Sequence, residues 1–184
     1  MMFKNAHRAF GCTLALTLAA ATLSAQAAKG LRVVPVVSDN REYLLVSVEL
    51  REGLTPDVRA AIDSGLKTIF TYTVDLRVDA TGWLDRTVAT AVITNSVEYD
   101  NLRRIHTLER RIDGRNEKPK TTENVNEVRE WMTSMKNLPL FRTRVLVPNR
   151  EYYVRVSATA RPSYGSILGP FGSGTSAQTK FIFP

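Results

Sequence analysis

A change in the apolar pattern near residue 70 constrains the fold more than any other feature. Over residues 58–69 the apolar side chains recur at steps of three and four, as on one face of a helix. Thr55 can cap this helix, and Pro56 suits its first position because no N–H donor is needed there. From Phe70 to Asp79 the step falls to two, which predicts a strand with one buried face. The chain is therefore expected to pair this strand into a sheet with a helix at its entry.

Similar runs of alternating or β-branched residues recur along the chain. The predicted strands are Leu31–Val37, Leu44–Leu50, Phe70–Asp79, Arg86–Tyr99, Leu102–Ile112, Leu140–Val147 and Tyr152–Arg161. Pro35 makes the first an edge strand, because proline cannot donate to a ladder. A polar loop over residues 115–121 precedes a second helix capped by Thr121 or Thr122. Its apolar stripe is Val125, Val128, Trp131, Met132 and Met135, and Asn137 is expected to end it.

Most of the predicted strands are joined by connections of hairpin length, and this favours antiparallel pairing. The last two strands are expected to form one hairpin around residues 148–150. The fold class predicted is mainly β (α+β), an antiparallel β-sandwich or strongly curved sheet with two amphipathic helices. Residues 28–161 would form a single domain, and residues 162–184 a flexible Gly/Ser/Pro-rich tail with a short apolar end at Phe181–Phe183.

The first 27 residues have the pattern of a signal peptide. Lys4 and Arg8 precede an apolar run over residues 10–23, and Ala25-Gln26-Ala27 supplies the small residues of a cleavage site. The run is shorter than the roughly 20 apolar residues that span a bilayer, and no later stretch is long and uncharged enough to do so. We expect cleavage after Ala27, no transmembrane segment afterwards, and a periplasmic or secreted protein.

Residue types restrict the chemistry that the exported chain could perform. Cys12, the only cysteine, lies in the predicted leader, so disulfides, thiolate nucleophiles and cysteine-bound metals are excluded from residues 28–184. His106 is the only histidine after the leader, and Glu109, three residues on, falls on the opposite face of a strand. We expect a partly exposed strand histidine, with no metal and no cofactor.

Common catalytic and phosphate-binding motifs do not fit. Gly165-Ser166 and Gly172-Ser173-Gly174 have the wrong spacing for a nucleophile elbow, and no lysine precedes Thr175 as a Walker loop requires. Carboxylates near predicted strand ends keep a glycan hydrolase open, because paired acids are defined by their separation in space. These carboxylates are Asp75, Asp79, Asp85, Glu98 and Asp100.

Arginine accounts for much of the formal net charge of +7. Guanidinium groups bind phosphate and carboxylate bidentately, so neighbouring strands that carry them would form an anion-binding sheet face. The residues assigned to that face are Arg103, Arg104, Arg110, Arg111, Arg142, Arg144, Arg155 and Arg161. In an exported protein the expected partner is an envelope protein or an anionic lipid or polysaccharide, and not nucleic acid.

Several short segments together resemble a known family. They are Leu54-Thr55-Pro56, Gly65-Leu66, Phe70–Leu76, Trp83-Leu84-Asp85 and Val97–Asp100. They are similar to segments of small exported bacterial proteins catalogued only as a domain of unknown function, and the resemblance covers Leu44 to Arg161. It implies a helix running into a strand and a tryptophan-aspartate hairpin. Some relatives are encoded beside membrane sensor kinases, which implies an envelope setting, and the resemblance brings no catalytic or cofactor residue.

The functional prediction is a non-catalytic module of the bacterial envelope that binds a protein or an anionic surface through the basic sheet face. The alternative is a carboxylate-dependent hydrolase of envelope glycans. A third possibility is an apolar ligand held between the sheet and its helices. A cleft with two facing carboxylates would favour the hydrolase, whereas a flat arginine-rich face would favour binding.

Overall fold

The computed structural model describes residues 30–78, 85–162 and 175–184. The predicted leader and its cleavage site lie outside this range, as do Asp79, Trp83 and both glycine-serine segments.

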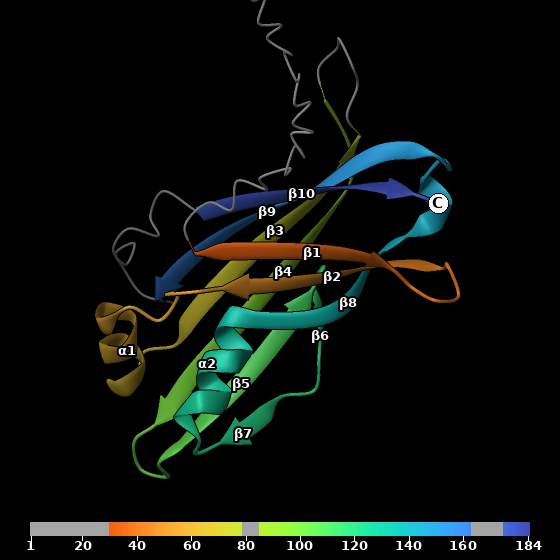
Figure 1. The fold of residues 1–184 in the computed structure, drawn as a ribbon. Coiled ribbons are helices and arrows are strands. Elements are labelled where there is room, and N and C mark those ends of the chain that lie inside the picture. Colours follow the sequence, from red (N-terminus) through yellow and green to blue (C-terminus); the bar gives the residue numbers. More distant parts are fainter. Residues whose placement is uncertain (1–29, 79–84, 163–174) are drawn as a thin grey trace, which may run out of the picture.

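Two antiparallel sheets pack face to face as a sandwich (Figure 1). The small sheet has the order β1 (Leu31–Val37), β2 (Tyr43–Leu50) and β8 (Ser134–Arg142). The large sheet has the order β10 (Thr175–Phe183), β9 (Arg150–Pro162), β3 (Thr68–Val78), β4 (Arg86–Asp100), β5 (Ile105–Ile112) and β6 (Arg115–Asn116), and β7 (Lys120–Thr122) also pairs with β5. The predicted mainly-β class with antiparallel pairing is confirmed.

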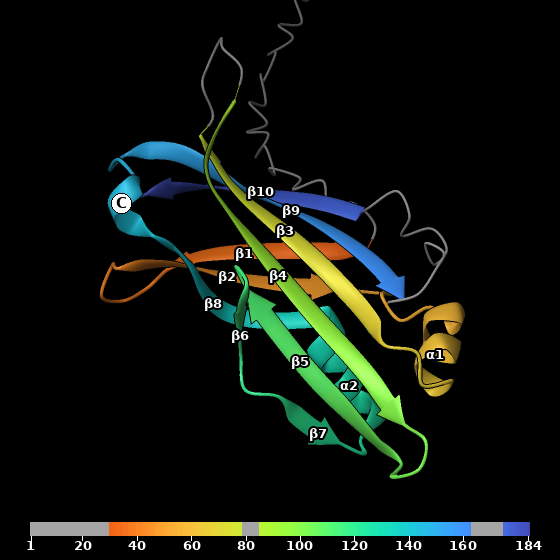
Figure 2. The same cartoon turned by 180° about the vertical axis from the view of Figure 1, so that it is seen from behind.

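Both predicted helices are present, α1 (Pro56–Asp63) and α2 (Val125–Thr133), together with a short 3-10 helix, η1 (Thr143–Val145). The Thr55 side chain accepts a hydrogen bond from the Val58 N–H at 3.3 Å, which confirms the predicted cap of α1. In Figure 2 the large sheet is in front, with α1 at the entry of β3 and α2 behind β4 and β5. Neither helix of the described segments is long and apolar enough to cross a membrane.

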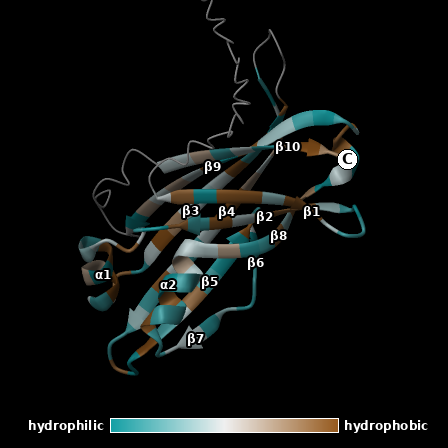
Figure 3. Ribbon diagram, viewed as in Figure 1, coloured by the Kyte–Doolittle hydropathy of each residue, from teal (hydrophilic) through white to brown (hydrophobic). Residues whose placement is uncertain are grey.

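The core lies between the two sheets and follows the predicted alternation (Figure 3). Every second residue of β3, from Phe70 to Val78, is buried and belongs to one cluster with Leu44, Val46 and Val48 of β2. The sequence predicts that this face of β3 packs against Val58, Ile62 and Leu66. Val58 and Ile62 of α1 are buried and belong to the same cluster, whereas Leu66, which follows α1, is 43% exposed.

The region after α2 differs from its prediction. Asn124, not Thr121 or Thr122, caps α2, and the helix ends at Thr133. The next nine residues form β8, with Asn137 at a positive φ of 51° within it. β8 pairs with β2 of the small sheet, so the predicted hairpin of residues 140–147 with residues 152–161 is wrong. Met132 and Met135 are three residues apart and therefore looked like two positions of one helix face. The same spacing also occurs where a helix ends and a strand follows.

The chain end also differs from its prediction. Thr175–Phe183, predicted as part of a flexible tail, forms β10 and pairs along the whole of its length with β9. Ala177 and Phe183 are buried, and the ring of Phe181 lies 6.0 Å from that of Tyr152. The prediction of a flexible tail is therefore wrong for residues 175–183, because β10 covers the edge of β9.

Two short segments differ from their predicted secondary structure. Residues 101–104 form a turn, so β5 starts at Ile105 and not at Leu102. The polar loop predicted over residues 115–121 contains β6 and β7, which pair with β5.

Candidate functional site

The eight predicted arginines do not share one sheet face. β5 and β9 are separated by β3 and β4, and β8 belongs to the other sheet. The condition for a common basic face, that these strands are neighbours, is therefore not met. Whether any of the eight binds an anion remains a prediction.

Arg103 and Arg104 lie in the turn between β4 and β5. The side chain of Asp100 accepts hydrogen bonds from the N–H groups of Leu102 and Arg103, and it forms a 3.9 Å ion pair with Arg103. Arg104 has a positive φ of 58° and donates its N–H to the Asp100 carbonyl. Arg103 and Arg104 thus belong to a turn and not to β5, so they do not share a strand face with Arg110.

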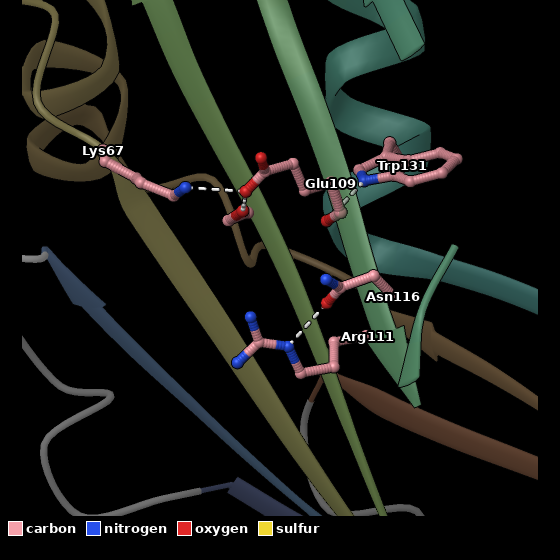
Figure 4. A network of polar contacts seen from close by, with 6 residues as sticks. Lys67, Glu109, Arg111, Asn116 and Trp131 are labelled. Carbon is pink, nitrogen blue, oxygen red and sulfur yellow. Dashed lines mark hydrogen bonds and ion pairs between the residues drawn. The ribbon is translucent and has the colours of Figure 1, made fainter. Parts of the chain in front are cut away.

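Arg111 faces outward from β5 (Figure 4). Its Nε donates to Asn116 Oδ1 of β6 at 2.8 Å. On the same outer face the Lys67 ammonium donates to Glu109 Oε2 at 2.6 Å, and this bond is the main reason why the pKa of Glu109 is lowered. Glu109 remains about half exposed, so the pair is an ordinary surface bridge of small value.

Arg110 faces the interior and completes the end of α2. The last carbonyls of a helix have no partner within it, and here the large sheet supplies the donors. The Trp131 carbonyl accepts from Asn95 Nδ2 at 2.9 Å and from Arg110 Nη2 at 3.3 Å, and the Met132 carbonyl accepts from Tyr72 Oη at 2.6 Å. The Arg110 charge also suits the negative end of the helix dipole. Arg110 of β5 thus has a structural role, which is to stabilise the end of α2.

The surroundings of Arg110 hold it in this position. Its Nε donates to Asn95 Oδ1 at 2.8 Å, and its guanidinium lies 4.3 Å from the centre of the Trp131 ring. Burial lowers the pKa of Arg110 and raises the pKa of Tyr72. Asn95 is fully buried, and its place opposite Arg110 in the ladder explains why two polar residues are tolerated there.

The remaining four arginines lie elsewhere. Arg155 and Arg161 are exposed on β9, and Arg155 is the ladder partner of Asp75 on β3. Arg142 at the end of β8 lies 5.0 Å from the ring of Tyr43, and Arg144 is exposed in η1. Arg142 and Arg144 do line one pocket, which they share with Arg41.

A larger groove of about 870 Å³ lies over the outer face of the small sheet. Its lining residues come from β1, β2, the β2–α1 connection, α1, α2 and the start of β8. Gly53 lines the groove where the β2–α1 connection meets the end of α2. A Cβ there would approach Leu50 Cδ2 to 2.7 Å and Thr133 Cγ2 to 3.0 Å. The absence of a side chain at Gly53 therefore allows the connection to pack directly against the end of α2.

Cationic side chains from separate elements line this groove. They are Arg32, Arg51, Arg59, Arg129 and Lys136, and the acidic side chains of the lining are Glu49, Glu52 and Glu130. Arg51 pairs with Glu49 at 3.4 Å, and Lys136 pairs with Glu130 at 2.8 Å.

Three arginines of the lining keep their charge available. Within residues 30–78, 85–162 and 175–184, none of Arg32, Arg59 and Arg129 forms an ion pair with a carboxylate; the Nε of Arg59 donates to the Leu54 carbonyl at 3.1 Å. The groove can therefore present three guanidinium groups to a carboxylate or phosphate.

The sequence prediction did not select these three arginines. Arg32 was visible as the one charge in the β-branched run of β1, and Arg129 is an exposed residue of α2 directly after the buried Val128. No local sequence pattern links them, because β1, α1 and α2 are far apart in the chain and contribute to one groove only in the folded protein.

Three of the carboxylates considered for a hydrolase already have structural partners. Asp75 accepts from Thr90 Oγ1 at 2.7 Å, Asp85 accepts from Tyr153 Oη at 2.6 Å, and Asp100 supports the turn described above. Glu98 is exposed on β4, and Asp79 lies outside the described residues. The hydrolase hypothesis gains no support from these positions.

His106 is buried and not partly exposed as predicted. It is 6% exposed, and its ring lies 4.5 Å from that of Tyr99 at an interplanar angle of 33°. Among the described side chains, no group of three or more His, Cys, Asp or Glu could hold a metal ion.

Comparison with known proteins identifies the family. Neither a curated protein nor a solved structure gives a significant match. A family model described as "Domain of unknown function (DUF4390)" matches residues 31–163, which is most of the chain and includes nine of the strands and both helices. The resemblance to a domain of unknown function is confirmed, and the chain belongs to the DUF4390 family.

Proposed function

We propose that this chain is an exported, non-catalytic module of the bacterial envelope that binds an acidic segment of another protein in the groove over the small sheet. The observation that carries the proposal is the meeting of Arg32, Arg59 and Arg129 in one open groove without carboxylate partners. Export to the periplasm or beyond rests on the leader pattern of residues 1–27.

The chemistry of the lining favours carboxylates on an extended segment. Arg32, Arg59 and Arg129 come from three different elements, β1, α1 and α2, and all three line the groove. A peptide with several Asp or Glu residues can meet guanidinium groups at separate positions, each through two parallel hydrogen bonds. The paired Glu49 and Glu130 leave the balance of the groove positive.

Titration of a fluorescein-labelled octaglutamate peptide tests the proposal by anisotropy. The variant Arg32→Gln/Arg59→Gln/Arg129→Gln removes three charges from the groove. The matched control Arg103→Gln/Arg104→Gln/Arg111→Gln removes three charges from exposed positions of β5 and its turn. We expect the groove variant to bind at least about tenfold more weakly and the control to stay within about threefold, because rim charges that a ligand does not contact contribute little.

Raising the salt concentration should weaken wild-type binding, because exposed charges interact only over about 8–10 Å near physiological ionic strength. Equal losses in the groove variant and its control would show non-specific attraction and reject the groove. Absence of wild-type binding at low salt would reject the whole proposal.

A further inference from the structure

A second basic surface lies at the end of the molecule that contains the C-terminus (Figure 1). We call it the arginine end, and it consists of Arg41, Arg142, Arg144 and Arg150 together with Val145, Val147 and Ile182. The turn between β1 and β2, the end of β8 with η1, and the end of β10 meet there in both views (Figures 1 and 2).

Backbone contacts fix the parts of the arginine end relative to one another. Thr143 donates its N–H to the Glu42 carbonyl at 3.0 Å, and its hydroxyl donates to the Arg41 carbonyl. The Asn149 N–H donates to the Phe183 carbonyl at 2.8 Å, which ties the β8–β9 connection to the end of β10. The arginines are therefore displayed on a joined base and not on three independent loops.

A shallow pocket of about 420 Å³ opens between these parts. Its lining includes Arg41, Arg142 and Arg144, with Glu42 as the acid among its lining residues. The ring of Tyr43 lies under the Arg142 guanidinium, which limits the positions that this group can take. Three guanidinium groups and one carboxylate leave this pocket positive, and guanidinium groups bind phosphate through parallel hydrogen bonds.

Aliphatic side chains project beside the arginines. Val145 and Val147 are 45% and 54% exposed on either side of the buried Leu146, and Ile182 is 68% exposed next to the buried Phe183. Exposed apolar groups next to a cluster of positive charges are typical of proteins that bind the interface of a membrane. In such proteins the aliphatic groups enter the headgroup layer while the charges remain with the phosphates.

We propose that the arginine end docks on the surface of an anionic phospholipid bilayer. A bilayer fits this end better than a protein partner, because exposed aliphatic side chains lie beside a pocket lined by Arg41, Arg142 and Arg144, and an anionic lipid surface presents phosphates next to an apolar layer. The groove over the small sheet lies near α1 and α2, at the opposite end of the sandwich (Figure 1). A docked molecule would leave that groove open for its partner, so the two proposals are independent.

Flotation with lipid vesicles tests the docking surface. Residues 28–184, the chain expected after cleavage of the leader, would be mixed with vesicles of phosphatidylglycerol and phosphatidylcholine in equal parts, and with vesicles of phosphatidylcholine alone. The variant Arg142→Glu/Arg144→Glu reverses two charges at the arginine end. Its control, Arg103→Glu/Arg104→Glu, makes the same change in the turn before β5, so the net charge is identical in the two variants.

We expect the wild type and the control to float with the anionic vesicles, and the arginine-end variant to lose at least about tenfold in partitioning. A second pair separates the apolar contribution: Val145→Ser/Val147→Ser should weaken partitioning several-fold, whereas Leu102→Ser, at a residue that is 97% exposed in the distant turn, should not. Equal behaviour of each variant and its control, or equal flotation with both kinds of vesicle, would overturn the docking surface.

Discussion

Arg110 and Arg111 are neighbours in the chain with opposite surroundings. Arg110 faces the interior, where it donates to Asn95 and to the Trp131 carbonyl at the end of α2. Arg111 faces solvent and donates to Asn116. Their roles differ because successive side chains of a strand point to opposite faces.

Arg110→Met should lower the free energy of unfolding by roughly 1.5–3 kcal/mol, because the buried Asn95 and the end of α2 lose a charged donor. Methionine keeps the apolar stem of the side chain. Arg111→Met is the matched control and should change stability by less than about 0.5 kcal/mol. Urea denaturation measures both, and equal costs would contradict the inward placement of Arg110.

Tyr72 is expected to make stability depend on pH in the alkaline range. Burial raises its pKa in the folded protein, whereas an unfolded tyrosine loses its proton near pH 10. Above about pH 10 the unfolded state therefore binds fewer protons, and the free energy of unfolding falls by up to about 1.4 kcal/mol per pH unit. Below pH 10 this contribution is fully present.

Tyr72→Phe should remove this part of the slope and also cost about 1 kcal/mol near neutral pH, because the Met132 carbonyl loses its donor. Denaturation midpoints measured from pH 8 to 11 give both quantities. An unchanged alkaline slope in the variant would show that other groups cause it.

At the scale of elements, β10 adds an edge strand to the large sheet from a segment that the sequence predicts to be a tail. It pairs with β9 over nine ladder positions and buries Phe183, although the sequence before it is dense in glycine, serine and proline. Because of that composition, the alternation of Ala177, Thr179 and Phe181 was not recognised as a strand. Their partners on β9 are distant in the chain, so no local pattern reveals them.

Phe183→Ala should cost about 3–5 kcal/mol, the usual range for removing a buried aromatic side chain. Ile182→Ala, one residue earlier and 68% exposed, should cost far less. Thermal unfolding of the two variants compares them directly. Similar melting temperatures would mean that the C-terminal segment is not docked on β9.

The α2–β8 junction shows why the predicted second helix was too long. Ser134–Arg142 contains no glycine and begins with residues that continue the apolar spacing of α2. Its strand conformation depends on pairing with β2, which lies about 90 residues earlier in the chain. Contacts between distant segments, and not local preference, thus decide the fate of this segment.

For the whole molecule, the sequence was sufficient for the fold class, the cap of α1 and the buried face of β3. Alternation and capping are local, so they can be predicted from neighbouring residues. The sequence left a sandwich and a single curved sheet open, and it did not predict which strands form each of the two sheets, because that depends on pairing between distant segments. The groove follows from that division: Arg32, Arg59 and Arg129 share it only because the small sheet brings β1 near both helices.

The central claim, that an acidic segment binds in this groove, is tested most directly by NMR of the arginine side chains. In the presence of octaglutamate, the Nε–H signals of Arg32, Arg59 and Arg129 should shift and saturate together. The signals of Arg103, Arg104 and Arg111 should remain in place, since these residues lie outside the groove lining. Shifts spread evenly over all six arginines, or confined to the second group, would contradict the account.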